Sequence, residues 1–198
     1  MFLADYAKPG SVVIDIGSAL GNNDPRLAGV SVYELTQNPK LKQKNVRVIA
    51  TDIPSEVQGF ENLKKTKTVY PIDYAEVPLT FNTPVADVLK KKNLENIKNV
   101  YLRAANSIDL LMNTEETKEH FDYISKTLKD KNVTYLYNNV ILNKPAGQTK
   151  FRKVGNLENT AFDHRRPSWK NNKSNKHYNL IDKNFDKGGE INWLEKYK

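Results

Sequence analysis

The chain of 198 residues contains no cysteine and has histidine at three positions, His120, His164 and His177. The absence of cysteine excludes disulfide bonds, a thiol nucleophile, cysteine-ligated zinc and iron–sulfur clusters. None of the three histidines stands in the H-E-x-x-H spacing of the zinc proteases. We therefore expect no metal site in this protein.

Long hydrophobic runs are also absent. No apolar stretch approaches the roughly 18 residues that a transmembrane helix needs. The residues that follow Met1 form neither a basic region nor a long apolar region, so no signal peptide is visible. From these absences we expect a cytoplasmic protein without a membrane span.

Charge is distributed unevenly along the chain. Residues 1–143 carry 18 basic and 17 acidic side chains, whereas residues 144–198 carry 13 basic and 6 acidic ones. The net charge of +8 therefore belongs almost entirely to a basic tail. A concentration of positive charge of this kind is compatible with an anionic partner such as nucleic acid.

Short β-branched runs alternate with segments of helical periodicity in residues 1–143. The pattern predicts strands over 11–16, 46–51, 68–72, 100–105 and 132–142, and helices after Asp24-Pro25, after Thr83-Pro84 and from Asn113 to about Lys129. Such alternation predicts an α/β fold, here a Rossmann-like parallel sheet flanked by helices. Residues 144–198 are expected to add short antiparallel strands (150–154 and 160–164), a basic loop and a short helix to the same domain, completing the sheet or capping a substrate site.

Ligands of open parallel sheets bind beyond the carboxyl ends of the strands. The first predicted strand runs into Asp15-Ile16-Gly17-Ser18-Ala19-Leu20-Gly21, which does not match the G-x-G-x-x-G fingerprint of nicotinamide cofactors. It resembles instead the first motif of class I S-adenosylmethionine-dependent methyltransferases, D/E-x-G-x-G-x-G, with Ala19 in place of the middle glycine.

Three further segments strengthen this resemblance. Ala50-Thr51-Asp52 is similar to the end of the second strand in chemotaxis-receptor glutamate methyltransferases, Asp73 begins a segment similar to the family's D-x-x-x-L-P motif, and Arg103 with Asn106 stands where the family has a fourth-strand motif. The resemblance implies S-adenosylmethionine as cofactor, with Asp52 at the ribose hydroxyls and Asp73 or its neighbour at the adenine. The cofactor-binding residues that it implies are Asp15, Gly17, Ser18, Ala19, Gly21, Asp52, Ile53, Asp73, Tyr74, Arg103 and Asn106.

Each of these residues also has a purely structural interpretation. Asp52 and Asp73 could be solvated acids at strand ends, Asn106 a turn residue, and Arg103 one half of a structural ion pair. His120 lies among charged residues in a predicted helix, and we expect it at the surface. The cofactor hypothesis predicts that Gly17, Asp52 and Asp73 converge at the carboxyl edge of the sheet.

The sequence does not identify the methyl acceptor, a catalytic residue or the oligomeric state. The first predicted strand begins about ten residues from Met1, so the substrate-binding N-terminal domain of the chemotaxis enzymes has no counterpart, and we do not expect receptor methylation. The acceptor could be a small molecule, a protein or a nucleic acid. His164, Arg165 and Arg166 are the candidate substrate residues, and they begin a stretch to residue 178 in which cations alternate with aromatics. Such a stretch can bind nucleic acid, and a solvated, lysine-rich loop is the alternative interpretation. The alternative function is an inactive methyltransferase-like binding or scaffold module that acts through its basic C-terminal region.

Overall fold

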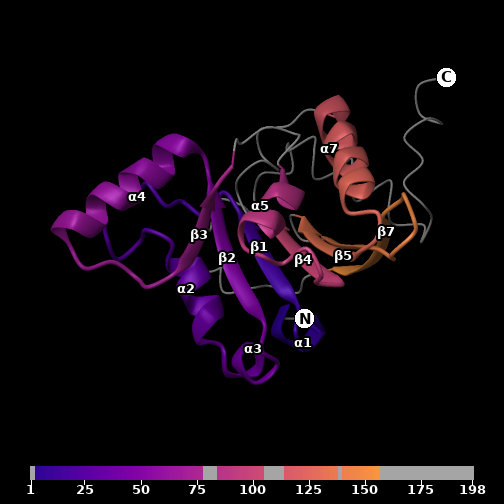
Figure 1. Cartoon of the computed structure of the whole chain (residues 1–198), viewed down its shortest axis with the longest axis horizontal. Coiled ribbons are helices and arrows are strands. Elements are labelled where there is room, and N and C mark those ends of the chain that lie inside the picture. The colour runs from indigo at the N-terminus through magenta and orange to yellow at the C-terminus, as the bar shows by residue number, and fades with distance from the viewer. Residues whose placement is uncertain (1–2, 78–83, 105–113, 138–139, 157–198) are drawn as a thin grey trace.

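A computed structural model describes residues 3–77, 84–104, 114–137 and 140–156 of the chain (Figure 1). The described strands form one seven-stranded sheet in the order β3-β2-β1-β4-β5-β6-β7. Strands β3, β2, β1, β4 and β5 are parallel, and β6 and β7 continue the sheet in antiparallel pairing. In chain order the elements are α1 (Leu3–Tyr6), β1 (Val12–Ile16), α2 (Val30–Gln37), α3 (Pro39–Gln43), β2 (Arg47–Asp52), α4 (Pro54–Thr66), β3 (Asp73–Glu76), α5 (Val85–Lys91), β4 (Asn99–Ala104), α7 (Thr114–Thr127), β5 (Asn132–Tyr137), β6 (Val140–Lys144) and β7 (Arg152–Asn156).

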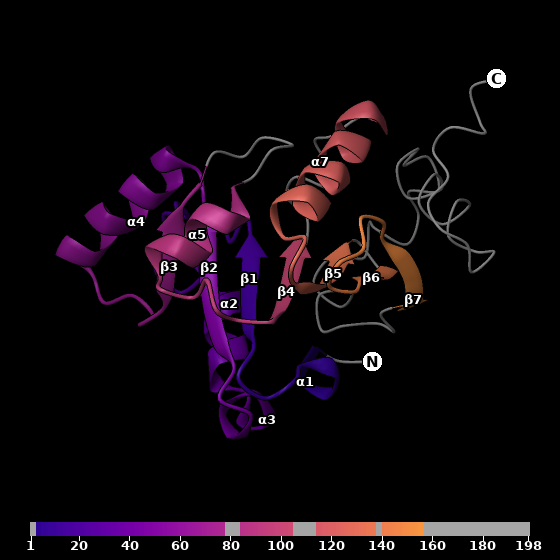
Figure 2. The ribbon, with the colours of Figure 1, turned by 45° about the vertical axis from the view of Figure 1, so that its right-hand side comes forward.

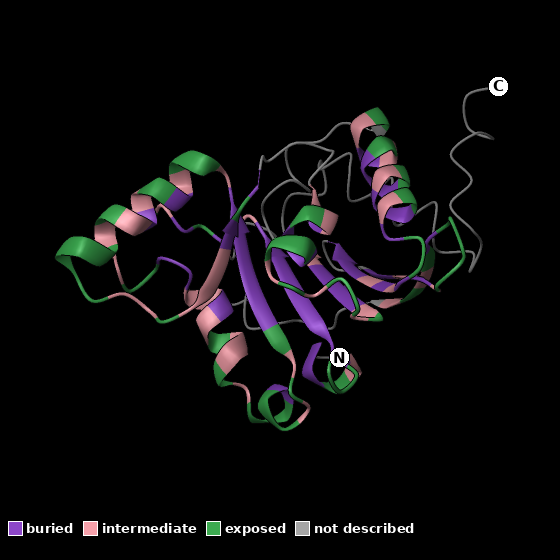
Figure 3. Cartoon of the chain, in the orientation of Figure 1, coloured by how far each residue is buried: buried purple, intermediate pink, exposed green. Residues whose placement is uncertain are grey.

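Helices cover both faces of this sheet (Figure 2). One core cluster joins α5 and α7 to side chains such as Ile14 and Leu102, and a second cluster joins helices α1 to α4 to Val13 and Tyr101. Because β1 is covered on both sides, all five of its residues are buried (Figure 3). Its continuous apolar sequence is typical of a central parallel strand. The predicted α/β class, the mostly parallel sheet with flanking helices and the short antiparallel region are therefore confirmed.

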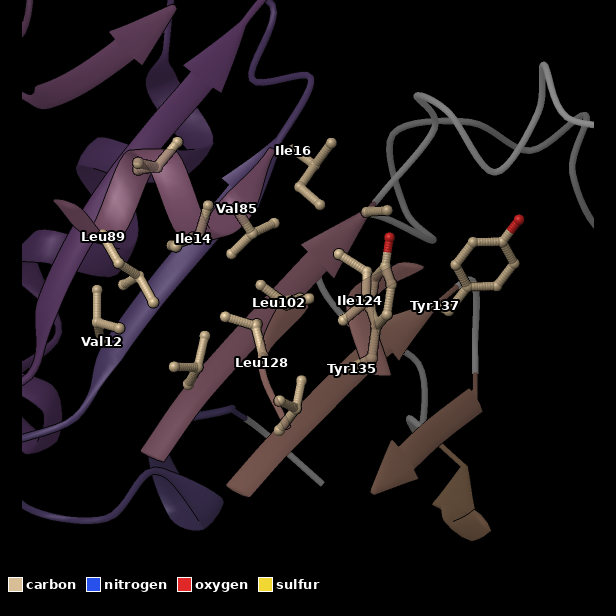
Figure 4. Packing of buried hydrophobic residues seen from close by; sticks show 14 of the residues in the cluster. Val12, Ile14, Ile16, Val85, Leu89, Leu102, Ile124, Leu128, Tyr135 and Tyr137 are labelled. Atoms are coloured by element: carbon tan, nitrogen blue, oxygen red, sulfur yellow. The ribbon is translucent and has the colours of Figure 1, made fainter. Parts of the chain in front are cut away.

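The core on the side of α5 and α7 contains a group of aromatic residues beside the aliphatic ones (Figure 4). His120 belongs to this interior, because its side chain is fully buried and its Nε2 lies 2.8 Å from Tyr135 Oη. Its ring also packs edge-on against Phe121 and Tyr135. The expectation that His120 lies at the surface is wrong: the charges around it in sequence occupy the outer side of α7, whereas His120 occupies the inner side.

Several predicted boundaries are also wrong. The segment predicted as one strand over 132–142 is a pair of antiparallel strands, β5 and β6. The third strand begins at Asp73 rather than ending there, because Pro71 cannot donate a ladder hydrogen bond and the pairing starts beyond it. Helix α2 begins at Val30, five residues later than the Asp24-Pro25 signal predicted.

Three of the described helices are present where none is predicted. Helix α1 precedes β1, α3 lies between α2 and β2, and α4 follows β2 directly. Of the two predicted C-terminal strands, β7 is observed over Arg152–Asn156, and residues 160–164 lie outside the described residues. The basic tail beyond residue 156 likewise lies outside them. Within the described ranges, no helix combines the length and the apolar character that a membrane crossing requires.

Candidate functional site

The candidate site lies at the carboxyl ends of β1, β2 and β4. From β1 the chain moves outward to β2 and β3 on one side, and it later returns to place β4 on the other side of β1. This reversal is the point in open α/β sheets where loops diverge and ligands bind. The residues that follow β1 therefore occupy the position in the fold where a ligand is expected.

The glycine loop, residues 17–21, turns sharply as it leaves β1. Gly17 has φ of 73°, and the Gly17 and Ser18 amides both donate to the Thr51 carbonyl oxygen, at 2.9 and 3.1 Å. Ala19 also has a left-handed φ, of 53°. The loop thus keeps at Ala19 a conformation that favours glycine, which is the residue that the methyltransferase motif has at this position.

Two carboxylates hold the far end of the glycine loop. Asp52 Oδ2 accepts from the Leu20 amide at 2.9 Å, and Asp52 Oδ1 accepts from the Ile53 amide at 3.0 Å. Glu56, in the first turn of α4, accepts from the Gly21 amide through Oε2 at 3.0 Å. A Cβ at Gly21 would lie 2.3 Å from Glu56 Oε2, so the approach of this carboxylate requires glycine.

A buried ion pair supports the loop from below. Asp15 is 3% exposed, accepts from Ser18 Oγ at 2.8 Å and lies 3.3 Å from Arg103 Nη1. Asp15 and Arg103 are direct neighbours in the register of β1 and β4. Arg103 therefore forms the structural ion pair that the sequence analysis gave as an alternative. Through Asp15 and Ser18, it connects β4 to the glycine loop.

The electrostatic environment of the loop is acidic. Burial raises the pKa of Asp52 above its ordinary value, the hydrogen bonds from Leu20 and Ile53 lower it, and the negative charges of Glu56 and Asp15 raise it further. Asp52 is 2% exposed. Because its oxygens already accept two amide hydrogen bonds inside the protein, Asp52 positions the loop rather than facing solvent.

Asp73 and Tyr74 are not brought to this site. In the register of β2 and β3, Asp52 pairs with Glu76, while Asp73 pairs with Ile49 near the opposite end of the strand. Asp73 instead forms ion pairs with Arg47, at 2.8 Å, and with Lys92. The predicted convergence of Gly17, Asp52 and Asp73 is therefore wrong, because the third strand is shifted along the sequence.

Tyr74 is likewise used elsewhere. Its hydroxyl accepts from Lys64 Nζ at 3.1 Å, and its ring packs edge-on against Phe60 of α4. Ile53 contributes its backbone amide to the hydrogen bond with Asp52. Asn106 and the predicted substrate residues His164, Arg165 and Arg166 lie outside the described residues.

Glu56 is the site residue that the sequence analysis misses. A signal for it exists, because Pro54 at the first helical position marks a helix start and Glu56 then falls in the first turn, where acids are favoured. That turn follows directly on β2, so it belongs to the same edge of the sheet. In the part of the chain that the structure describes, no three His, Asp or Glu side chains are grouped as a metal site would need.

No protein-family model matches the chain, and no curated protein is significantly similar to it.

Proposed function

We propose that this protein is an S-adenosylmethionine-dependent methyltransferase whose Rossmann-like core binds the cofactor at the glycine loop. The observation that carries the proposal is the set of hydrogen bonds made by that loop. The amides of Gly17, Ser18, Leu20 and Gly21 donate to acceptors within the protein, and two of those acceptors are the carboxylates of Asp52 and Glu56.

This arrangement favours one class of nucleotide cofactor over another. A dinucleotide site presents loop amides to a pyrophosphate and needs few negative charges nearby. Here four loop amides are already engaged, and the carboxylates of Asp52 and Glu56 would repel a pyrophosphate. S-adenosylmethionine has no phosphate, carries a positive sulfonium and an ammonium group against one carboxylate, and offers ribose hydroxyls that donate to carboxylates. The donor and acceptor set of the loop therefore fits this cofactor.

We assign different roles to the two carboxylates. Glu56 is half-buried at the first turn of α4 and would accept from the ribose hydroxyls. Asp52 is a positioning residue that fixes Leu20 and Ile53 and thereby shapes the loop. Asp15 and Arg103 hold the loop's base. The cofactor, when bound, supplies an electrophilic methyl group on its sulfonium, and the protein's part is to orient that group towards a nucleophile of the acceptor.

An inactive binding module remains the second candidate, and one observation favours it. Asp52 is buried beneath the loop, and Glu56 lies against Gly21 so closely that a Cβ would not fit between them. A carboxylate that serves only to fasten α4 to the loop would produce the same contacts. The two candidates differ in the expected affinity for the cofactor, because a glycine loop whose only role is to connect β1 with α4 is not expected to bind an adenosyl group.

The test is calorimetric titration of the full chain with S-adenosylhomocysteine. We expect micromolar binding, about −8 kcal/mol, and about tenfold weaker binding by Glu56→Gln because a charge-assisted hydrogen bond becomes a neutral one. Glu61→Gln is the matched control. Glu61 lies on the same helix, and its carboxylate contacts Lys64 rather than the loop.

Three outcomes decide between the candidates. Binding by the parent and by Glu61→Gln with a loss in Glu56→Gln supports the methyltransferase proposal. Equal binding by all three proteins contradicts the role of Glu56. Absence of binding by a folded parent contradicts the cofactor and leaves the binding module.

A further inference from the structure

Three connecting segments meet at the amino edge of the sheet, opposite the glycine loop. Residues 90–98 lead from α5 into β4, residues 126–131 lead from α7 into β5, and residues 145–152 lead from β6 into β7. The Asn132 amide donates to the Lys98 carbonyl at 2.9 Å, and the Gly147 amide donates to the Lys129 carbonyl at 2.7 Å. These bonds place the three segments side by side.

This edge carries a concentration of exposed lysines, which we call the basic edge. The three segments contain only two acidic residues, Glu95 and Asp130. Asp130 is already engaged with Lys131 at 3.0 Å, an interaction that lowers the pKa of its carboxyl group. The connections are largely solvent-exposed (Figure 3). The exposed lysines of the basic edge are Lys90, Lys91, Lys98, Lys126, Lys129 and Lys150.

Two buried ammonium groups add to the positive charge behind the exposed lysines. Lys144 is fully buried, and its Nζ donates to the carbonyls of Leu128 and Lys131, both at 3.0 Å. Lys131 is 7% exposed and donates to the Glu95 carbonyl at 2.6 Å. Lys144 donates to neutral carbonyls, and the Asp130 carboxylate that pairs with Lys131 also acts electrostatically on Lys144, so one carboxylate acts on both ammonium groups.

Helix geometry explains part of this pattern but not all of it. Lys90, Lys91 and Lys126 lie in the last turns of α5 and α7, where cations stabilise the helix dipole. Lys98, Lys129 and Lys150 lie outside helices, so that explanation does not apply to them. A surface of like charges carries a repulsive cost, which a bound polyanion would remove.

We propose that the basic edge binds nucleic acid through its phosphate backbone. Neutralisation of several phosphates by lysines releases counterions and gives affinity without sequence specificity. An anionic membrane is the other polyanionic surface to consider, but stable membrane binding usually combines basic residues with apolar anchors. Among the described residues, the exposed large hydrophobic side chains are Leu27 and Val154, and neither lies in the three segments.

This inference does not rest on the proposed cofactor site, which lies at the other end of the strands. It concerns a surface made by described residues, and the basic residues 164–178 are not part of the proposal. A triple substitution of Lys90, Lys98 and Lys129 by glutamine can therefore be tested independently. The matched control replaces Lys42, Lys65 and Lys67, which are exposed and belong to the segments around α3 and α4.

The experiment is fluorescence anisotropy of the full chain with a labelled 20-nucleotide RNA and with DNA of the same sequence, at salt concentrations from about 50 to 200 mM. We expect binding that weakens steeply with salt. The Lys90, Lys98 and Lys129 triple variant should bind about tenfold more weakly, with a salt slope lower by about one unit for each phosphate that is no longer neutralised. The control variant should bind less than about threefold more weakly than the parent, since only the long-range effect of net charge remains.

Folding and cofactor binding provide the internal check. The triple variant should keep the parent's thermal midpoint and its affinity for S-adenosylhomocysteine, whatever that affinity is. No binding of either nucleic acid at about 50 mM salt, or an equal weakening in both triple variants, would overturn the proposal. Binding to vesicles of anionic phospholipid that is tighter than binding to RNA and DNA would overturn it in favour of a membrane partner.

Discussion

Among single residues, Asp52 contributes most to the shape of the glycine loop, because its buried carboxylate accepts hydrogen bonds from two backbone amides. Its ionised form is stabilised by those amides but opposed by burial and by the neighbouring acids Glu56 and Asp15, so its pKa is raised overall. The folded protein therefore binds a proton at Asp52 more readily than the unfolded chain does. This difference links stability to pH.

Comparison of the parent protein with the Asp52→Asn variant should reveal this link between stability and pH. Between the ordinary value of 3.8 and the raised pKa, the folded parent holds more protons than the unfolded chain, so the parent's stability should fall as pH rises through this window. Asparagine does not titrate, so the stability of the Asp52→Asn variant should lack this pH-dependent contribution. Urea denaturation of both proteins from about pH 4 to pH 7 measures the difference. A stability advantage of the parent over Asp52→Asn that grows with rising pH would show that the pKa is lowered instead.

At the scale of elements, β4 connects the N-terminal segment to the sheet through one side chain. Tyr101 is 4% exposed, and its hydroxyl accepts from the Lys8 amide and donates to the Tyr6 carbonyl, both at 3.0 Å. The phenol thereby fixes the end of α1 and the turn into β1. Burial raises the pKa of this hydroxyl, which keeps it protonated and able to donate.

Replacement of Tyr101 by phenylalanine should destabilise the protein by about 1–3 kcal/mol, because two backbone groups lose a buried partner. Tyr123→Phe is the control: Tyr123 is a partly buried residue of α7, and we expect its change to stay within about 0.5 kcal/mol. Urea denaturation provides the stability change. Equal effects of both substitutions would contradict the assignment of the Tyr101 hydroxyl as the connection.

The elements also show what the sequence can and cannot predict. The central strands β1, β2 and β4 are predictable because burial on both faces requires continuous apolar runs. The β5–β6 pair is missed because both strands are apolar and only the polar pair Asn138-Asn139 interrupts them in the sequence. Helix α4 is missed because its inner face uses few buried side chains, chiefly Val57 and Phe60.

The residues of the candidate site are also predictable from the sequence only in part. Asp15, Gly17 and Asp52 follow from strand ends that the pattern identifies, and the structure places them together. Asp73 is misplaced because its strand begins where the pattern has it end. The Asp15–Arg103 pair depends on the register between β1 and β4, which the sequence of a single chain does not specify.

At the scale of the whole molecule, charge is separated along the strand direction. Acids stand in the first turns of α4, α5 and α7, and lysines of the basic edge stand in the last turns of α5 and α7. Because each of these helices leads from the carboxyl end of one parallel strand to the amino end of the next, these acids lie at the carboxyl edge and these lysines at the amino edge. The acidic edge suits a phosphate-free cationic cofactor, and the basic edge suits a polyanion.

The cofactor proposal is tested most directly by finding where the ligand binds on the protein. Titration of ¹⁵N-labelled protein with S-adenosylhomocysteine, followed through backbone amide resonances, reports that position residue by residue. The account predicts shifts concentrated in residues 17–21 and 53–56, with the Gly21 amide among the largest because its partner Glu56 would engage the ribose. Shifts confined to other parts of the chain, or no shifts at millimolar ligand, would contradict it.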